Sequence, residues 1–175
     1  MIRTSFAALC LALISGAPAY AADLFNADGK WLGEGQMSTG VRAPLERGRC
    51  QVEVAPSEGA DAAAGGDVNV IGFCAVAAGK SDISLRLVRN GDGGVNAGFW
   101  SAATGQTIQL AGQETPEQIE MISTTALIVD DEPFETQVRV IAPDEDSFQI
   151  RQIMRAEGEE KWRLVAEMTY HRVDG

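Results

Sequence analysis

The sequence predicts an all-β protein, an antiparallel up-and-down barrel of roughly 8–10 strands. Short segments alternate between apolar and polar residues, tight turn signals separate nearly all of them, and no segment sustains a helical period. The clearest alternation lies in residues 47–54, where Cys50, Val52 and Val54 fall on one face. Because a long meander must close or leave its edges exposed, a closed or nearly closed barrel is favoured.

The first residues have the features of a secretion signal. Arg3 supplies the positive charge, a short apolar run follows over residues 6–14, and Ala19-Tyr20-Ala21 fits the small-x-small cleavage rule. We expect cleavage after Ala21 or Ala22. Residues 1–22 are then the signal peptide, residues 23–175 form a single β-barrel domain, and the product is periplasmic or secreted.

Two other interpretations of the leader are open. The apolar run is shorter than a bilayer-spanning helix requires, so an uncleaved anchor is disfavoured. A lipoprotein is disfavoured because Leu9, and not glycine or alanine, precedes Cys10. With no second apolar run of membrane length, we expect no membrane insertion after cleavage.

The cysteines predict one disulfide. The chain has three, of which Cys10 leaves with the signal, and Cys50 and Cys74 remain in an oxidising compartment. They lie on neighbouring strand candidates, residues 47–54 and 67–76, which we interpret as a hairpin bonded across its two strands. A redox pair or metal ligands are the rival interpretation, and the lack of a C-x-x-C motif and the single histidine speak against it.

The charge balance excludes some partners. The chain has 14 basic and 25 acidic residues, a net charge of −11, and its basic residues are scattered singly. Loss of the segment that contains Arg3 would make the charge more negative. Nucleic acid and anionic membrane surfaces are therefore not expected as partners.

The remaining elements follow from alternation between turn residues. The glycines at positions 33 and 35 in the first strand indicate a bend or a close backbone approach. Residues 90–94, Asn-Gly-Asp-Gly-Gly, form the strongest turn signal, and Pro143 opens an acidic turn. In chain order, strands are expected at residues 29–37, 47–54, 67–76, 83–87, 95–101, 107–111, 134–140, 148–155 and 161–172. Residues 117–125 could start as a helical turn and continue as a strand, and residues 127–129 are a short apolar run.

The last strand has a regular pattern that should face the interior and close the barrel. One face carries Trp162, Leu164, Ala166, Met168 and Tyr170, and only Val165 departs from the alternation. This strand should pair with the first strand around Trp31, which would place Trp162 inside.

Aromatic and methionine side chains are expected to face the barrel interior. They either line an apolar cavity or simply fill the barrel. The candidate ligand-lining residues are Trp100, Phe148, Met168 and Tyr170.

Gly29-Lys30-Trp31 resembles the Gly-x-Trp motif that opens the first strand of lipocalins. The resemblance implies a lipocalin-like, calycin-type barrel in which a basic residue of the last strand, Arg172 or Arg163, covers Trp31. The segments 46–50, 73–75 and 98–100 are similar to small exported bacterial barrels for which no activity is established. Ligand binding is what a lipocalin-like architecture would imply.

Catalytic chemistry has little support in the sequence. His171 is the only histidine and should lie on the outer surface. The acidic runs at 130–132 and 144–146 do not match a calcium-binding loop and are expected to be solvated turns. The sequence therefore predicts no catalytic residues, no metal and no cofactor, and the protein is not expected to be an enzyme.

Two functions remain. The first is an exported binding protein that holds a small apolar ligand in its barrel. The second is an envelope protein-interaction module, such as a protease inhibitor or an accessory subunit, with a filled barrel. A hydrolase is a distant third.

Overall fold

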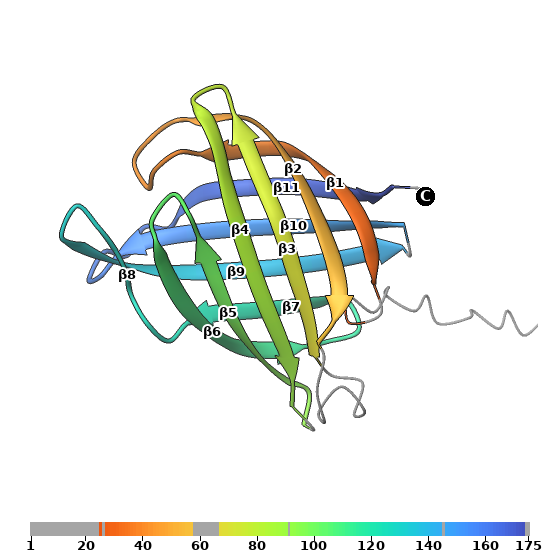
Figure 1. Cartoon of the computed structure of the whole chain (residues 1–175). Helices are drawn as coiled ribbons and strands as arrows, with labels where there is room; N and C mark the ends of the chain where they lie inside the picture. The colour runs from red at the N-terminus through yellow and green to blue at the C-terminus, as the bar shows by residue number, and fades with distance from the viewer. Residues whose placement is uncertain (1–24, 26, 58–66, 91, 145, 174–175) are drawn as a thin grey trace, which may run out of the picture.

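The computed structural model describes residues 25, 27–57, 67–90, 92–144 and 146–173, with the side chains of residues 142–144 left aside. The predicted signal peptide lies outside these residues. Within them the chain forms an antiparallel β-barrel (Figure 1). Its strands are β1 (Gly29–Ser38), β2 (Leu45–Pro56), β3 (Asp67–Val76), β4 (Gly79–Arg89), β5 (Gly94–Ser101), β6 (Gln106–Glu114), β7 (Gln118–Ser123), β8 (Leu127–Val129), β9 (Glu132–Asp144), β10 (Ser147–Ala156) and β11 (Arg163–Arg172).

The barrel is closed and runs up and down, which confirms the predicted fold class. Each barrel strand pairs with the next along the chain, and β10 pairs with both β9 and β11. The short β8 is the exception, because it pairs only with β9. Strand β7 also pairs with β9, and not with β8. Figure 1 shows β3, β4 and β5 crossing in front of β9, β10 and β11, as two walls of one barrel.

The two ends of the chain close the barrel by pairing β1 with β11. Trp31 lies opposite Arg172 and Gly35 opposite Met168. The predicted pairing of the last strand with the strand around Trp31 is therefore confirmed. No helix in the described part of the chain is long and apolar enough to span a bilayer.

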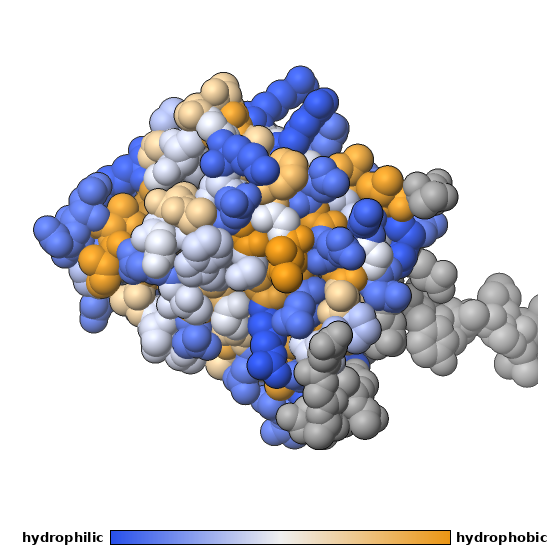
Figure 2. Space-filling view, viewed as in Figure 1, coloured by the Kyte–Doolittle hydropathy of each residue, from blue (hydrophilic) through white to orange (hydrophobic). Residues whose placement is uncertain are grey.

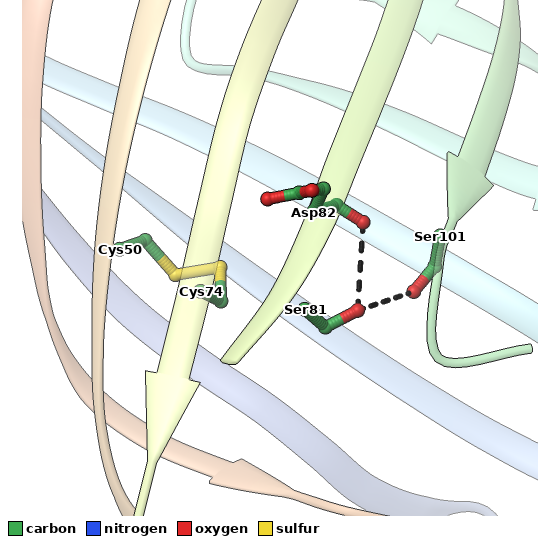
Figure 3. The surroundings of a disulfide bond; sticks show 5 residues. All are labelled: Cys50, Cys74, Ser81, Asp82 and Ser101. Atoms are coloured by element: carbon green, nitrogen blue, oxygen red, sulfur yellow. Dashed lines mark hydrogen bonds between the residues drawn. A yellow bond between two sulfur atoms is a disulfide. The ribbon is translucent and has the colours of Figure 1, made fainter. Parts of the chain in front are cut away.

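The predicted disulfide joins β2 and β3. Cys50 and Cys74 lie directly opposite each other in the β2–β3 register, and both are buried on the inward face (Figure 3). Closing a loop of 24 residues should stabilise the fold by about 3.5 kcal/mol in the chain-entropy model. The inward face of the neighbouring β4 continues this row with Ser81, whose Oγ lies 3.4 Å from Ser101 Oγ.

Three inward glycines allow neighbouring strands to approach closely. A Cβ added at Gly35, Gly72 or Gly112 would lie 2.1, 2.0 or 1.9 Å from a backbone carbonyl oxygen of the paired strand. Such contacts are far below van der Waals distance, so only glycine fits where these strands bend. The expectation that glycine in the first strand marks a close approach is confirmed at Gly35.

A β-bulge corrects the predicted face of the last strand. Gln152 pairs with Ala166 but the next residue, Ile153, pairs with Leu164, so Val165 is the extra residue. Val165 is buried, and Leu164 shares the outward face with Ile153. The sequence pattern cannot show this inversion, because the bulge is set by pairing with β10.

The same bulge removes Trp162 from the interior. β11 begins at Arg163, and Trp162 lies before it, half-buried, with the Arg155 guanidinium 4.6 Å from its ring centroid. The prediction that Trp162 lies inside the barrel and helps to close it is therefore wrong.

Candidate functional site

One end of the barrel is closed by a cluster of aromatic rings. The rings of Phe148 and Tyr170 stack with centroids 4.6 Å apart, and Trp31 meets Phe148 edge to face at 4.8 Å. Tyr170 lies against Gly33, where an added Cβ would be 2.6 Å from the ring. All three aromatic residues are buried, so this end of the barrel is filled.

The cover that the lipocalin resemblance implied for Trp31 is present. The Arg172 guanidinium lies 4.6 Å from the Trp31 ring centroid, and its Nη1 donates a hydrogen bond to the Asp28 carbonyl oxygen at 2.7 Å. The Trp31 indole N–H donates to the Ala27 carbonyl oxygen at 2.9 Å. Trp31 and Arg172 thus hold the segment before β1 against this end of the barrel. Arg163, the other basic residue proposed to cover Trp31, is exposed.

The four predicted ligand-lining residues do not lie together. Phe148, Met168 and Tyr170 are inward and buried, in or beside the aromatic cluster. Trp100 faces outward, because its β4 partner is Ser84 while the inward Phe99 pairs with Leu85. The prediction for Trp100 is therefore wrong, since alternation alone does not say which of two adjacent aromatic residues points inward.

At the other end, the β1–β2 loop reaches across to the β8–β9 turn. The Arg42 guanidinium forms a 2.8 Å ion pair with Glu132 and lies 5.8 Å from the Phe134 ring centroid. Hydrogen bonding to the Glu132 carboxylate, together with its charge, raises the pKa of Arg42 above its ordinary value. Val41 and Phe134 are buried beneath this contact.

Five inward side chains form one row across five adjacent strands, from the middle of β9 to the end of the barrel at the β1–β2 loop. Each residue lies opposite the next in the β-sheet register, and each is half-buried. We call this set the interior row; it consists of Val138 on β9, Gln152 on β10, Ala166 on β11, Met37 on β1 and Glu46 on β2.

Val138 is the member of the interior row whose exposure differs most clearly from that of its own strand. On β9 the inward neighbours of Val138 are Thr136 and Val140, which are 0% and 3% exposed, so backbone on the outer surface contributes little. Val138 nevertheless remains only partly buried. Val138 is thus more accessible than either inward neighbour on its strand, although it packs against the hydrophobic core.

Strands β3, β4 and β5 also carry half-buried inward side chains. Val70 on β3, Leu85 on β4 and Phe99 on β5 lie opposite one another in the register, face inward and are only partly buried. The members of the interior row on β9, β10 and β11 face this group across the barrel, whereas Glu46 lies on β2, the paired neighbour of β3 (Figure 1). Together the interior row and this group define the candidate site, which is mostly apolar and includes two polar side chains, Glu46 and Gln152.

Those two polar side chains have no protein partner. Among the described residues, neither the Gln152 amide nor the Glu46 carboxylate makes a hydrogen bond or an ion pair. Nearby, Thr136 Oγ1 is buried without a hydrogen-bond partner in the described part of the chain. Glu46 and Gln152 are only half-buried, so their polar groups can bind water or a further molecule.

Burial also changes the chemistry of Tyr170. Desolvation raises the pKa of its phenol to about 12, so the hydroxyl stays neutral at physiological pH. With the phenol held neutral against the aromatic cluster, Tyr170 supplies packing to the closed end and no charge to the site.

The described part of the chain holds no group of three or more potential metal ligands. His171 is exposed, as expected. In the acidic turn between β8 and β9, Asp130 and Asp131 adopt positive φ angles of 52° and 63°, and Glu132 binds Arg42. This turn is a structural feature that also anchors the second end of the barrel.

The interior row could not be assembled from the sequence. The alternation that places Val138 inward was visible, and so was the shared face of Met37 and Trp31. The alignment of Gln152 and Glu46 with them depends on register across four strand pairs. No protein family model matches the chain, and no curated protein matches it either.

Proposed function

We propose that the protein is an exported binding protein that holds a small apolar ligand inside its barrel. The observation that carries this proposal is the interior row, whose five inward residues are half-buried, with Val138 between two fully buried inward neighbours on β9. A ligand between this row and the inward side chains of β3, β4 and β5 would cover both groups at once.

The width of the barrel supports this proposal. An eight-stranded barrel is just wide enough for side chains to fill it or for one small ligand to bind. This barrel has ten strands, and several of its inward positions carry glycine or alanine. The inward glycines themselves leave no space, because the neighbouring strand or a side chain lies against them, so it is the strand number that favours a wider interior.

Export is supported by the sequence and by the disulfide. The features of residues 1–22 are those of a cleaved leader. The Cys50–Cys74 bond is compatible with an oxidising compartment outside the cytoplasm. N-terminal sequencing of the mature protein should find Asp23 or Ala22 first, and a retained Met1 in the exported fraction would contradict this part of the proposal.

The binding proposal is tested by titration with a neutral apolar fluorophore, N-phenyl-1-naphthylamine. Fluorescence should rise saturably with the wild-type protein. In Ala166→Phe, a bulky ring enters the interior row and should weaken binding at least tenfold. The control, Ala75→Phe, places the same ring on the outward face of β3 and should leave binding unchanged.

Two results would contradict the binding proposal. One is the absence of saturable fluorescence with the wild-type protein. The other is equal binding by Ala166→Phe and wild type, which would place the fluorophore on the outer surface. Urea unfolding of both variants shows that each is folded before its binding is compared.

A specific observation favours the protein-interaction module as the second candidate. Ile71 on the outward face of β3 is 64% exposed, and Phe73 and Trp100 lie outward on the same wall. Figure 2 shows apolar groups interspersed with polar ones on this side of the barrel. A periplasmic protein retained by the wild type but lost with Ile71→Glu would favour this function.

A further inference from the structure

We infer that the ligand carries an ammonium head group, which the interior row binds through Glu46 and Gln152 while its apolar chain lies along the inward wall. This inference rests on the proposed function and names the chemical class of the ligand. The juxtaposition that carries it is an inward carboxylate and an inward amide on one register row, neither with a protein partner.

Glu46 is the first part of the argument. Its register partner Met37 lies on the same inward face as Trp31, so the Glu46 side chain points into the barrel and not onto its outer surface. The side chain is half-buried, and no ion pair is formed to it within the described residues. A carboxylate without a protein partner is complemented by a cation beside it.

Gln152 is the second part. It lies on the same row, separated from Glu46 by β11 and β1, which corresponds to about 14 Å along the wall. Because the wall curves, inward side chains of one row converge towards the barrel axis. The Gln152 carbonyl oxygen accepts hydrogen bonds, so it complements an N–H donor that is bound at Glu46.

The charges facing the interior exclude the opposite head group. In the described strands, the inward cations are confined to the ends. Arg172 covers Trp31, and Arg89 is paired with Glu114 at 2.7 Å. Arg163 lies at the start of β11 opposite the inward Met154, and it is exposed. The interior row itself holds no lysine, arginine or histidine, so a carboxylate ligand would meet Glu46 without a balancing charge on the row.

The apolar part of the ligand follows from the other residues. Val138, Ala166 and Met37 complete the interior row, and Val70, Leu85 and Phe99 face its members on β9, β10 and β11 across the barrel. These side chains offer only apolar contact. The ligand class is therefore a primary amine on a short aliphatic or aromatic chain, with its charged end at Glu46.

The test compares octylammonium, octanol and octanoate as competitors of N-phenyl-1-naphthylamine at neutral pH. These compounds share one apolar chain and differ in the head group. Octylammonium should displace the fluorophore at a concentration at least tenfold lower than octanol, and octanoate should be the weakest. In Glu46→Gln, the advantage of octylammonium over octanol should disappear while octanol binds as before.

A matched control separates a local effect from the net charge of the protein. Glu53→Gln removes the same charge from the outward face of the same strand and should keep the preference for octylammonium. Gln152→Ala should weaken octylammonium about threefold or more and leave octanoate unaffected.

The inference is overturned if octanoate competes as well as octylammonium, or if Glu46→Gln keeps the amine preference. It is also overturned if Glu53→Gln loses that preference as fully as Glu46→Gln does. Failure of the proposed function has a different outcome, in which the fluorophore does not bind to the wild-type protein at all.

Discussion

Trp31 and Trp162 carry the same side chain but differ in how deeply it is buried. Trp31 is 1% exposed, is held by Phe148 and Arg172, and donates its N–H to a backbone oxygen. Trp162 immediately precedes the first residue of β11. Its side chain is half-buried and contacts the Arg155 guanidinium. The contribution of a tryptophan to stability depends on this difference in burial and not on its type.

We therefore predict different losses of stability for the two tryptophans. Trp31→Ala should lower the free energy of unfolding by roughly 3–5 kcal/mol, because a large side chain leaves a filled end of the barrel. Trp162→Ala should cost only about 1 kcal/mol, mainly through lost contact with Arg155. Denaturant unfolding with the disulfide intact measures both, and equal losses would contradict the assignment of the filled end.

Tyr170 predicts a loss of stability at alkaline pH. A tyrosine in the unfolded chain has a pKa of about 10, and burial raises the pKa of Tyr170 to about 12. The unfolded state releases the phenolic proton first. Stability from Tyr170 is therefore complete below pH 10 and is lost as the pH rises towards 12.

Between pH 9 and pH 11, wild type should lose about 1 kcal/mol more stability than Tyr170→Phe. Urea unfolding at both pH values gives this difference, and the phenylalanine variant is the control for every other titrating group. Tyr20 and Tyr170 are the two tyrosines of the chain. Absorbance titration of protein without residues 1–22 therefore reports Tyr170 directly, and a midpoint near 10 would contradict its burial.

At the scale of strands, glycine decides where neighbouring elements bend together. Gly72 of β3 and Gly112 of β6 lie against carbonyl oxygens of β2 and β7. Gly98 of β5 has no atom within 3.6 Å of its would-be Cβ, and its φ angle is not in the left-handed region. The same residue type is thus required at two positions and replaceable at the third.

Gly112→Ala should destabilise the protein by roughly 2–3 kcal/mol, because the methyl group forces β6 and β7 apart. Gly98→Ala is the matched control and should change stability by less than about 1 kcal/mol, in either direction. Thermal and urea unfolding measure both variants. Equal effects would show that the approach of β6 to β7 is not as close as the structure has it.

At the scale of the whole molecule, closure removes the sheet edges that a ten-strand meander would otherwise expose. β1 and β11 are the chain ends of the meander, yet each is paired on both sides. Only β8 pairs with a single neighbour. The protection of backbone amides from hydrogen exchange should therefore depend on whether a strand is paired on both sides, and not on its position in the chain.

Amide hydrogen exchange tests this closure. The amides of Gly33–Gly35 and Met168–Tyr170 should exchange as slowly as those of β4 and β5, because opening the seam requires global unfolding. The amides of β8 serve as the internal control and should exchange much faster. Fast exchange confined to β1 and β11 would show that the barrel is open at this seam.

Register explains why the prediction of the fold was better than that of the candidate site. Alternation and turns indicate strands locally, and the short connections then leave few topologies besides a meander. The face of each strand is less certain, because one extra residue inverts it. The predicted faces of Trp100 and Trp162 were both wrong for this reason. For Trp100 the neighbouring Phe99 faces inward instead, and for Trp162 the bulge at Val165 inverts the face.

The all-β class, the antiparallel meander and the Cys50–Cys74 pair follow from the amino-acid sequence, because they depend on local periodicity and on residues in adjacent strands. Which side chains share the barrel interior follows from the three-dimensional arrangement of the strands. Glu46 and Gln152 are 106 positions apart, and no local pattern relates them. Closure of β1 on β11 brings them onto one row, because hydrogen-bonded register is a property of strand pairs across the whole barrel.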